Sequence, residues 1–519
     1  MVLPGVGFFG SGTLAQLLID QLQEQGFCIE GIWSPNVDDA KNLSHSRSIP
    51  FYSSIIDKVL LLPSVQLIIT ACPPHYHNQI ASKACGIGKH VICDWPPSHS
   101  LKDTVTMRKA ASNYPALITL FLTGLRFVPT FNIMRRLIID ENFLGHIRLI
   151  NATVMCDVIS VYKEKSIIWD KHMGGGLLSL YGTNMIDIIS FLTDYRAHRV
   201  HGMIQCFKQL SQNAIRFNTT EDYVNFQMEL HPMINDKRSM MMMNKNNKTK
   251  LLTAIKDDPI IANIQLNGHH YNCQPKHEIY VYGTNGYLVC RDGDLYAFRT
   301  NNNDSIKNNI DSNRMLITAL QQPLLNDNNV FGRETLLYKL QDLPITTTTT
   351  TTTKHYHHYP YETSSSSSSS SSYNVYPKIY LIGIRLMIQA LKNAFHGTTN
   401  NNNNNNNNFL HSSSSNGHHH HHHHDHHHDD NNDDDDDDNS IIMSNGVFND
   451  HNMINGKQQQ QQQRQSKQQQ QQKHEMIQWI KDPVNQAVSF DDGIYLQSVL
   501  ESIRKSSDLR EWIRIHLFD

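Results

Sequence analysis

Short apolar runs alternate with helix-like patterns from the start of the chain. Between the first two runs, leucines recur at positions 14, 17, 18 and 22, which places them on one face of a helix. The apolar runs occupy residues 6–9, 28–33, 65–71, 90–94 and 116–121. Strands that alternate with helices in this way indicate βαβ units around a parallel sheet. The pattern predicts a doubly wound parallel sheet over residues 1–124, with helices at 75–86 and at 100–113, the second capped by Ser100.

The pattern changes after residue 124, where strand-like runs outnumber helical ones. We expect strands at 147–157, 224–230 and 278–282, and helices at 131–141 and after Gly182. This balance predicts an α+β second domain with a large, mostly antiparallel sheet. The domain is expected to span residues 125–345, with an expanded loop at 235–250.

Two later stretches, 346–376 and 397–474, consist mainly of Thr, Ser, Asn, His, Asp and Gln runs. They have few apolar residues to bury, so we expect disordered, low-complexity insertions. Residues 377–396 are amphipathic and predict a helix of the second domain. Residues 475–519 are expected to complete the fold with a helix and a strand.

Charge and composition exclude some classes of protein. The formal net charge is −3 at pH 7, which gives no basic field for nucleic acid. No apolar run approaches the length that crosses a bilayer. Eight cysteines form no CxxC pair, as expected for reduced thiols. The histidine tracts at 418–424 and 426–428 are interpreted as a solvated spacer, so no metal site is expected.

A glycine-rich turn follows the first predicted strand directly. Residues 10–15 read Gly-Ser-Gly-Thr-Leu-Ala, a G-x-G-x-x-A spacing that opens a helix. Gly10 allows a tight turn, Gly12 lets the backbone approach a pyrophosphate, and Ala15 permits close packing of helix on strand. The sequence therefore predicts a dinucleotide site, with Ser11, Thr13 and Leu14 contributing to it.

The position that usually reads the ribose, at the end of the second strand, holds Ser34. A carboxylate there would repel a 2′-phosphate, and none is present. The cofactor is therefore expected to be NADP or NAD, with a lean towards NADP.

Several motifs, in order, resemble the Gfo/Idh/MocA oxidoreductase family, and more narrowly the animal glucose-fructose oxidoreductase domain-containing proteins. They are CPPHYH at 72–77, GIGKHVICD at 86–94, GLRFVP at 124–129, Trp169, GGG at 174–176, GTNMID at 182–187, YGTNG at 282–286 and SFDDGIY at 489–495. The resemblance implies a Rossmann domain that binds NAD or NADP. It also implies a second domain whose open sheet forms homo-oligomer contacts, and a sugar or polyol substrate. By the same resemblance, we expect Pro73, His77, Asp94 and Trp95 to contribute to the cofactor site.

Three positions where the family places catalytic residues are altered. The family's lysine position holds Trp95, and its aspartate and histidine positions hold Leu180 and Asn184. Trp95 either stacks on the nicotinamide or packs beneath its loop. We therefore expect a cofactor-binding protein with weak or no turnover.

The alternative is a divergent NADP-dependent oxidoreductase that uses His172 or Tyr181 for proton transfer, with Lys171, His77 and Arg126 also near the cofactor. In either case the resemblance implies that the substrate pocket includes Arg126, Trp169 and Asn184.

The compartment is expected to be the cytoplasm, because cleavage of a leader would remove the first strand. A secreted, matrix-assembly role, known for a related member, is a further alternative.

Overall fold

The first sheet has six parallel strands in the order β3-β2-β1-β4-β5-β6. They are β1 (Gly5–Phe9), β2 (Ile29–Trp33), β3 (Tyr52–Ser53), β4 (Val65–Thr70), β5 (His90–Cys93) and β6 (Thr119–Phe121). The order in which strands are added reverses between β1 and β4, which pair side by side in parallel. The predicted doubly wound sheet is thus confirmed, and its switch point lies where such sheets bind ligands.

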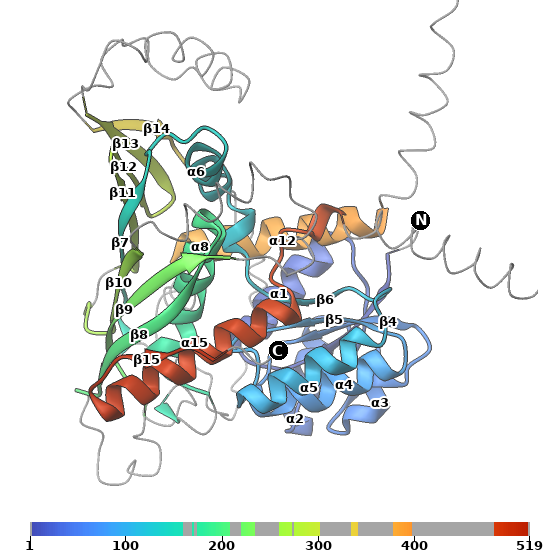
Figure 1. Cartoon of the computed structure of the whole chain (residues 1–519). Helices are drawn as coiled ribbons and strands as arrows, with labels where there is room; N and C mark the ends of the chain where they lie inside the picture. The colour runs from blue at the N-terminus through green and yellow to red at the C-terminus, as the bar shows by residue number, and fades with distance from the viewer. Residues whose placement is uncertain are drawn as a thin grey trace, which may run out of the picture. The chain divides into compact units, whose positions relative to one another are not determined.

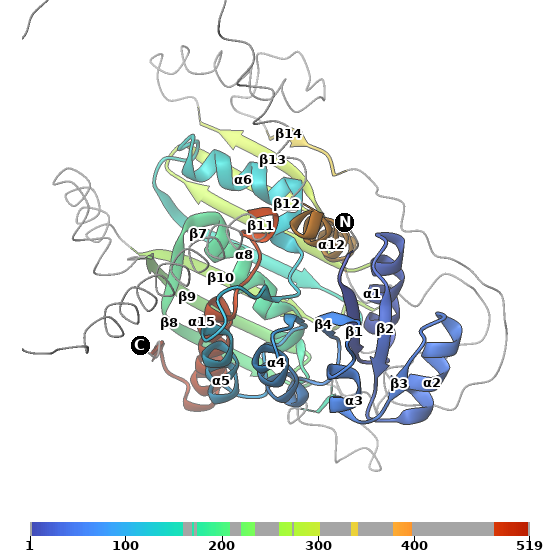
Figure 2. The same ribbon diagram turned by 90° about the vertical axis from the view of Figure 1, so that its right-hand side faces the viewer.

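The helices of this sheet cover both of its faces (Figures 1 and 2). They are α1 (Thr13–Glu24), α2 (Val37–Ser46), α3 (Ile56–Leu60), α4 (His77–Gly86) and α5 (Leu101–Ser112). The Ser100 side chain accepts a hydrogen bond from the Asp103 N–H, so the expected cap of α5 is confirmed. On the α1 side the sheet is covered further by a helix from much later in the chain.

This computed structural model describes residues 3–158, 169–170, 174–207, 220–233, 259–271, 274–300, 334–340, 377–396 and 482–516. The chain divides into two compact units, residues 1–395 with 481–519 and residues 396–480. Apart from His396, every described residue belongs to the first unit. The stretches expected at 235–250, 346–376 and 397–474 lie outside the described residues, as do Lys171 and His172. None of the described helices is both long and apolar enough to cross a bilayer.

The second sheet has nine strands in the order β14-β13-β12-β11-β7-β10-β9-β8-β15, antiparallel except for the β7 and β10 pair. They are β7 (Ile147–Met155), β8 (Tyr195–Gln205), β9 (Tyr223–Pro232), β10 (Ile260–Asn267), β11 (Lys276–Gly283), β12 (Gly286–Arg291), β13 (Asp294–Arg299), β14 (Thr335–Tyr338) and β15 (Ile513–Arg514). Along β10 buried and half-buried residues alternate, because successive side chains point to opposite faces. The expected large, mostly antiparallel sheet is confirmed.

The described helices packed on this sheet lie on one of its faces (Figure 1). They are α6 (Pro129–Ile139), α8 (Thr183–Thr193) and α15 (Phe490–Leu509). The C-terminal helix α15 packs against both β8 and α5, and so joins the two sheets. Its first turn carries a capping box between Ser489 and Asp492.

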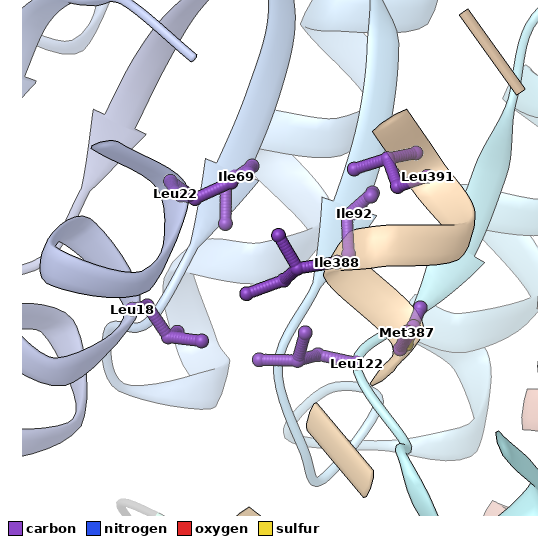
Figure 3. A pocket seen from close by; sticks show the side chains of 8 residues that line it. All are labelled: Leu18, Leu22, Ile69, Ile92, Leu122, Met387, Ile388 and Leu391. Carbon is purple, nitrogen blue, oxygen red and sulfur yellow. The ribbon is translucent and has the colours of Figure 1, made fainter. Parts of the chain in front are cut away.

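Helix α12 (Lys378–His396) crosses from the second sheet to the first. Near its start, Tyr380 packs 5.8 Å from the Tyr181 ring. Further along, it encloses an apolar cavity of about 10 Å³ with α1 and the first sheet (Figure 3). The lining residues are Leu18, Leu22, Ile69, Ile92, Leu122, Met387, Ile388 and Leu391. A cavity this small and apolar stays dry, so the contact acts as ordinary core packing.

The crossing requires glycine on both segments, Gly124 after β6 and Gly383 in α12. A Cβ on Gly124 would lie 2.1 Å from the Gly383 carbonyl carbon, far inside van der Waals contact. Since Gly124 follows the first sheet, this close approach fixes α12 next to the end of β6.

Candidate cofactor site

The glycine turn is held between the exits of β2 and β4. Gly10 has φ +143°, and a Cβ there would lie 2.0 Å from the Ala71 carbonyl oxygen. Its N–H donates to the Trp33 carbonyl at 2.9 Å. Helix α1 then begins at Thr13 with Gly12 at its N-cap and no side-chain cap. This geometry presents a helix N-terminus at the switch point, the arrangement that suits a pyrophosphate.

The end of β2 carries a hydroxyl group, and the start of α2 carries carboxylates. Ser34 is 1% exposed, and its Oγ lies 2.9 Å from the Ser11 Oγ, so the two serines connect the end of β2 to the glycine turn. Asn36 caps α2 by accepting from the Asp38 N–H at 3.0 Å. Asp38 and Asp39 occupy the first turn of α2.

His77 joins the exits of β4 and β5. The side chain is fully buried, with Nε2 2.9 Å from the Cys72 carbonyl oxygen and Nδ1 3.2 Å from that of Pro97. Burial lowers the pKa of His77 to about 4, so the ring is neutral near pH 7. A neutral ring carries one N–H and donates to one of these carbonyls at a time. His77 therefore holds the two loops together, and its contribution to the cofactor site stays a prediction.

Asp94 and Trp95 follow β5. The Asp94 N–H donates to the Thr70 Oγ1 at 3.2 Å, and burial raises the pKa of the Asp94 carboxyl to about 7. The Trp95 ring lies 5.0 Å from Phe121, which lies 4.8 Å from Phe490 at the start of α15. Trp95 thus packs into a column of aromatic rings.

The Trp95 Nε1 is buried and has no hydrogen-bond partner within the described ranges. A buried N–H without an acceptor is destabilising, typically by about 1–3 kcal/mol. A bound group that offers an acceptor would remove that penalty.

The triple glycine of the second sheet reaches across to the first. Gly174 has φ +76°, and a Cβ there would lie 2.8 Å from Cγ of Pro74 and 3.4 Å from Cγ of Pro96. Gly176 has φ +101°, and its Cβ would lie 2.4 Å from the Glu221 Oε1. The turn therefore touches the exits of both β4 and β5.

The two altered helix positions follow this turn. A π-helix over Leu178–Gly182 leads into α8 and contains Leu180, which is half-buried against the core. Asn184 is 7% exposed, and its Nδ2 donates to the Leu180 carbonyl at 3.2 Å. Neither side chain is able to accept a proton at neutral pH.

Tyr181 and Trp169 are core residues of the second sheet. Tyr181 is fully buried and hydrogen-bonds the Cys156 thiol, whose pKa burial raises to about 12. Trp169 is 1% exposed. The Tyr181 ring lies 5.8 Å from that of Tyr380, and its role in proton transfer stays a prediction.

Arg126 is fixed by protein acceptors on all three guanidinium nitrogens. Nε and Nη2 donate to the two oxygens of Asp187 at 3.1 and 2.5 Å, and Nη1 donates to the Gln486 carbonyl at 3.2 Å. Asp492 lies 3.8 Å from Nη1. Arg126 thus joins α8 to the C-terminal segment, and its contact with a substrate stays a prediction.

The aromatic partners of Trp95 carry no role in the sequence-based interpretation. Phe121 ends β6, and its N–H donates to the Val488 carbonyl at 2.8 Å. Phe490 lies in the SFDDGIY motif. That motif indicated the family resemblance of this segment, but it did not indicate the contact of Phe490 with Phe121. The pairing joins residues far apart in the chain, and no local pattern reports it.

The residues fit a dinucleotide. The glycine turn admits no Cβ at Gly10, the end of β2 offers hydroxyls, and Trp95 Nε1 is a buried donor in need of an acceptor. A doubly wound sheet with such a turn at its switch point, joined to a sheet that reaches over its strand exits, defines an NAD(P)-binding oxidoreductase scaffold.

Comparisons with known proteins agree with this assignment of the scaffold. Residues 4–120 match the model for the oxidoreductase family, NAD-binding Rossmann fold. Glucose-fructose oxidoreductase domain-containing protein 2 of Xenopus laevis is 35% identical over 329 residues, 63% of this chain and 75% of that protein. The chain therefore belongs to the Gfo/Idh/MocA oxidoreductase family, as the motifs indicated.

Two solved structures share the fold at low identity. Levoglucosan dehydrogenase in complex with NADH and L-sorbose aligns with a TM-score of 0.56 at 12% identity, over 99% of both chains. The super-repressor mutant of Gal80p from Saccharomyces cerevisiae aligns with a TM-score of 0.53 at 13% identity, over 99% of this chain and 98% of that one.

Proposed function

We propose that this protein binds NADP or NAD in the site described above, and that turnover by the family's route is weak or absent. The observation that carries the proposal is a glycine turn held in dinucleotide-binding geometry together with Trp95, Leu180 and Asn184 at the altered positions. The glycine turn retains the backbone geometry that pyrophosphate binding requires. The altered positions lack a proton acceptor.

The size of the loss follows from general acid–base chemistry. A positioned proton-transfer group typically contributes about 10²- to 10⁴-fold in rate. Asn184 could hold a substrate oxygen through its amide, and Trp95 could donate one hydrogen bond, but neither can take the alcohol proton. A bound nicotinamide would supply hydride transfer, and the residues present supply mainly its orientation.

Each part of the site has a role in this proposal. The turn from Gly10 to Leu14 binds the pyrophosphate, and Ser34 binds the adenosine ribose. Pro73, held in place by His77, and Asp94 border the nicotinamide end, where the Trp95 Nε1 donates to an acceptor of the cofactor. A sugar or polyol would lie against Arg126, Trp169 and Asn184.

The choice between the two cofactors depends on the end of β2. Ser34 puts no carboxylate at the ribose position, which supports a lean towards NADP. Asp38 and Asp39 in the first turn of α2 act in the opposite direction, because they would repel a 2′-phosphate. We propose that both cofactors bind, and that the preference for NADP is small.

The open face of the second sheet is proposed to form a homo-oligomer contact. It carries half-buried aromatic residues, among them Tyr280 and Tyr282, whose rings stack at 5.9 Å, and Tyr287 against Phe298 at 5.2 Å.

In the same proposal the chain has a Rossmann domain at 1–124 and a second domain at 125–345. That second domain is completed by the helix at 377–396 and by the C-terminal segment within 475–519.

A divergent oxidoreductase is the second candidate function. Levoglucosan dehydrogenase with NADH and the Gal80p super-repressor share this fold. The scaffold thus occurs both in a dehydrogenase and in a repressor, so a binding role and a turnover role are each compatible with it.

The test is a titration of the full chain with NADPH and with NADH, followed by energy transfer from tryptophan to the reduced nicotinamide. Saturable binding at micromolar to submillimolar cofactor supports the proposal. Absence of binding at millimolar concentrations of both cofactors would remove it. A screen of sugars and polyols at 340 nm then separates the two candidates, since only the second predicts saturable turnover.

A further inference from the structure

Three polar side chains form a row across one end of the second sheet. Asp222 directly precedes β9, and His269 and Tyr271 follow β10. The two strands are antiparallel with Tyr223 opposite Asn267, so the start of one meets the end of the other. The Tyr271 hydroxyl lies 3.0 Å from the His269 Nδ1, and the His269 Nε2 lies 3.2 Å from the Asp222 Oδ1.

Solvent exposure increases along this row of side chains. The Asp222 side chain is fully buried, that of His269 is 23% exposed, and Tyr271 is 51% exposed. Asp222 is held from its buried side, because the Phe207 N–H donates to both carboxylate oxygens at 2.9 and 3.1 Å. The Phe207 ring packs edge-on against His269 at 5.7 Å. The carboxylate and the imidazole are therefore fixed, and the phenol faces solvent.

The partners define the direction of the proton. Ionised Asp222 only accepts, so it favours the His269 tautomer with hydrogen on Nε2. That tautomer leaves Nδ1 to accept from the Tyr271 O–H. The Nε2–H does not point straight at Oδ1, so Asp222 acts mainly through its charge at 3.2 Å.

This end of the sheet is also the end connected to the cofactor site. The Leu177 N–H donates to the Glu221 carbonyl at 3.2 Å, next to Asp222 in the chain. Leu177 directly follows the triple glycine, whose Gly174 lies against Pro74 and Pro96. An isolated bridge also joins His269 to Asp157, two residues after the end of β7.

We propose that Asp222, His269 and Tyr271 form a proton relay, with the Tyr271 hydroxyl as the group that exchanges a proton with a carbonyl or alcohol substrate. The inference rests on the proposed cofactor site and concerns the second candidate function.

In reduction, a bound reduced nicotinamide would supply hydride to the substrate carbonyl carbon, and the oxygen would take the proton of Tyr271. His269, protonated on both nitrogens at this point, would return a proton to the phenolate and would take another from solvent. Oxidation runs in reverse, so atoms and electrons balance with the cofactor as the only redox partner.

The competing explanation is a purely structural contact that holds β9 and β10 together at the surface. Such a contact needs Asp222 and His269, but it does not need an activated phenol. The reactivity of Tyr271 towards an electrophile therefore distinguishes the two explanations, because a structural contact does not raise it.

The experiment labels the full chain with an aryl sulfonyl fluoride and follows each tyrosine by peptide mass spectrometry. Tyr114, which is 41% exposed on the loop after α5, is the internal control. We expect Tyr271 to react at least about 10²-fold faster than Tyr114, the lower end of what a positioned base typically contributes. His269→Gln should lower the Tyr271 rate to near that of Tyr114, and Asp222→Asn should lower it partly. Equal rates for the two tyrosines, or no effect of His269→Gln, would overturn the relay.

A second measurement separates this proposal from the proposed function. Tyr271→Phe should leave the Kd for NADH unchanged and abolish any carbonyl reduction found in a screen. Fast labelling of Tyr271 in a chain that fails to bind NADH would overturn the cofactor site, while the activation of the Tyr271 phenol by His269 would still stand. Turnover unchanged in Tyr271→Phe would overturn the relay while leaving the cofactor site intact.

Discussion

Gly12→Ala is the sharpest perturbation of the cofactor site, because the protein backbone tolerates it. Gly12 has φ −71° and ψ −176°, an extended conformation that alanine adopts without strain. Alanine is a poorer N-cap than glycine, which costs about 1 kcal/mol of stability. The fold should therefore survive the change with a small fall in Tm.

The effect on binding should be much larger. The new methyl group would project where the backbone of the turn approaches the pyrophosphate. Forcing a methyl group into a packed contact typically costs about 1–3 kcal/mol. That range corresponds to a Kd for NADH raised about 5- to 150-fold.

Calorimetric titration of the full chain with NADH measures this change. Gly86→Ala is the matched control, since Gly86 ends α4 with no atom within 4 Å of the added Cβ. The control should leave the Kd unchanged. An unaltered Kd in a folded Gly12→Ala protein would refute the assignment of the turn to the cofactor.

Three further predictions concern the same site. Ser34→Asp should weaken NADPH binding at least about tenfold more than NADH binding, because a carboxylate would face the 2′-phosphate; equal effects in paired titrations would contradict the placement of the ribose. The combined change Trp95→Lys, Leu180→Asp and Asn184→His should raise the rate of polyol oxidation, followed at 340 nm, about 10²- to 10⁴-fold over wild type. An unchanged rate with intact NADH binding would show that catalysis requires further residues that this chain lacks. Burial raises the pKa of Asp94 from 3.8 in the unfolded chain to about 7, so its contribution to stability is present below pH 4 and is lost as the pH rises to 7. Urea unfolding should therefore show Asp94→Asn gaining stability relative to wild type between pH 4 and 7, and a constant difference would contradict the buried carboxyl.

The elements of the nucleotide-binding sheet follow from local patterns. Apolar runs with helical spacing between them predict β1, α1 and β2, and the glycine turn is written in consecutive residues. The strand order then follows from right-handed crossovers in doubly wound sheets. The alternation of apolar residues similarly predicts the second sheet.

The contacts that complete the site could not be predicted in this way. The Trp95, Phe121 and Phe490 column joins residues nearly 400 positions apart, and only tertiary packing brings it together. Tyr181 has the right chemistry for proton transfer, and its complete burial on the π-helix is a tertiary property that no local pattern predicts. His269 and Tyr271 follow a strand without any motif, so their pairing with Asp222 depends on the register of β9 and β10.

The central claim is that the chain retains its dinucleotide site and lacks the family's proton-transfer groups. Parallel measurement of NADH binding and of single-turnover hydride transfer with a panel of sugars and polyols tests both parts on one protein. The account predicts saturable binding, with hydride transfer at least about 10²-fold slower than in the triple variant carrying Lys, Asp and His. Rapid hydride transfer by the unaltered chain, or no binding at millimolar NADH and NADPH, would contradict it.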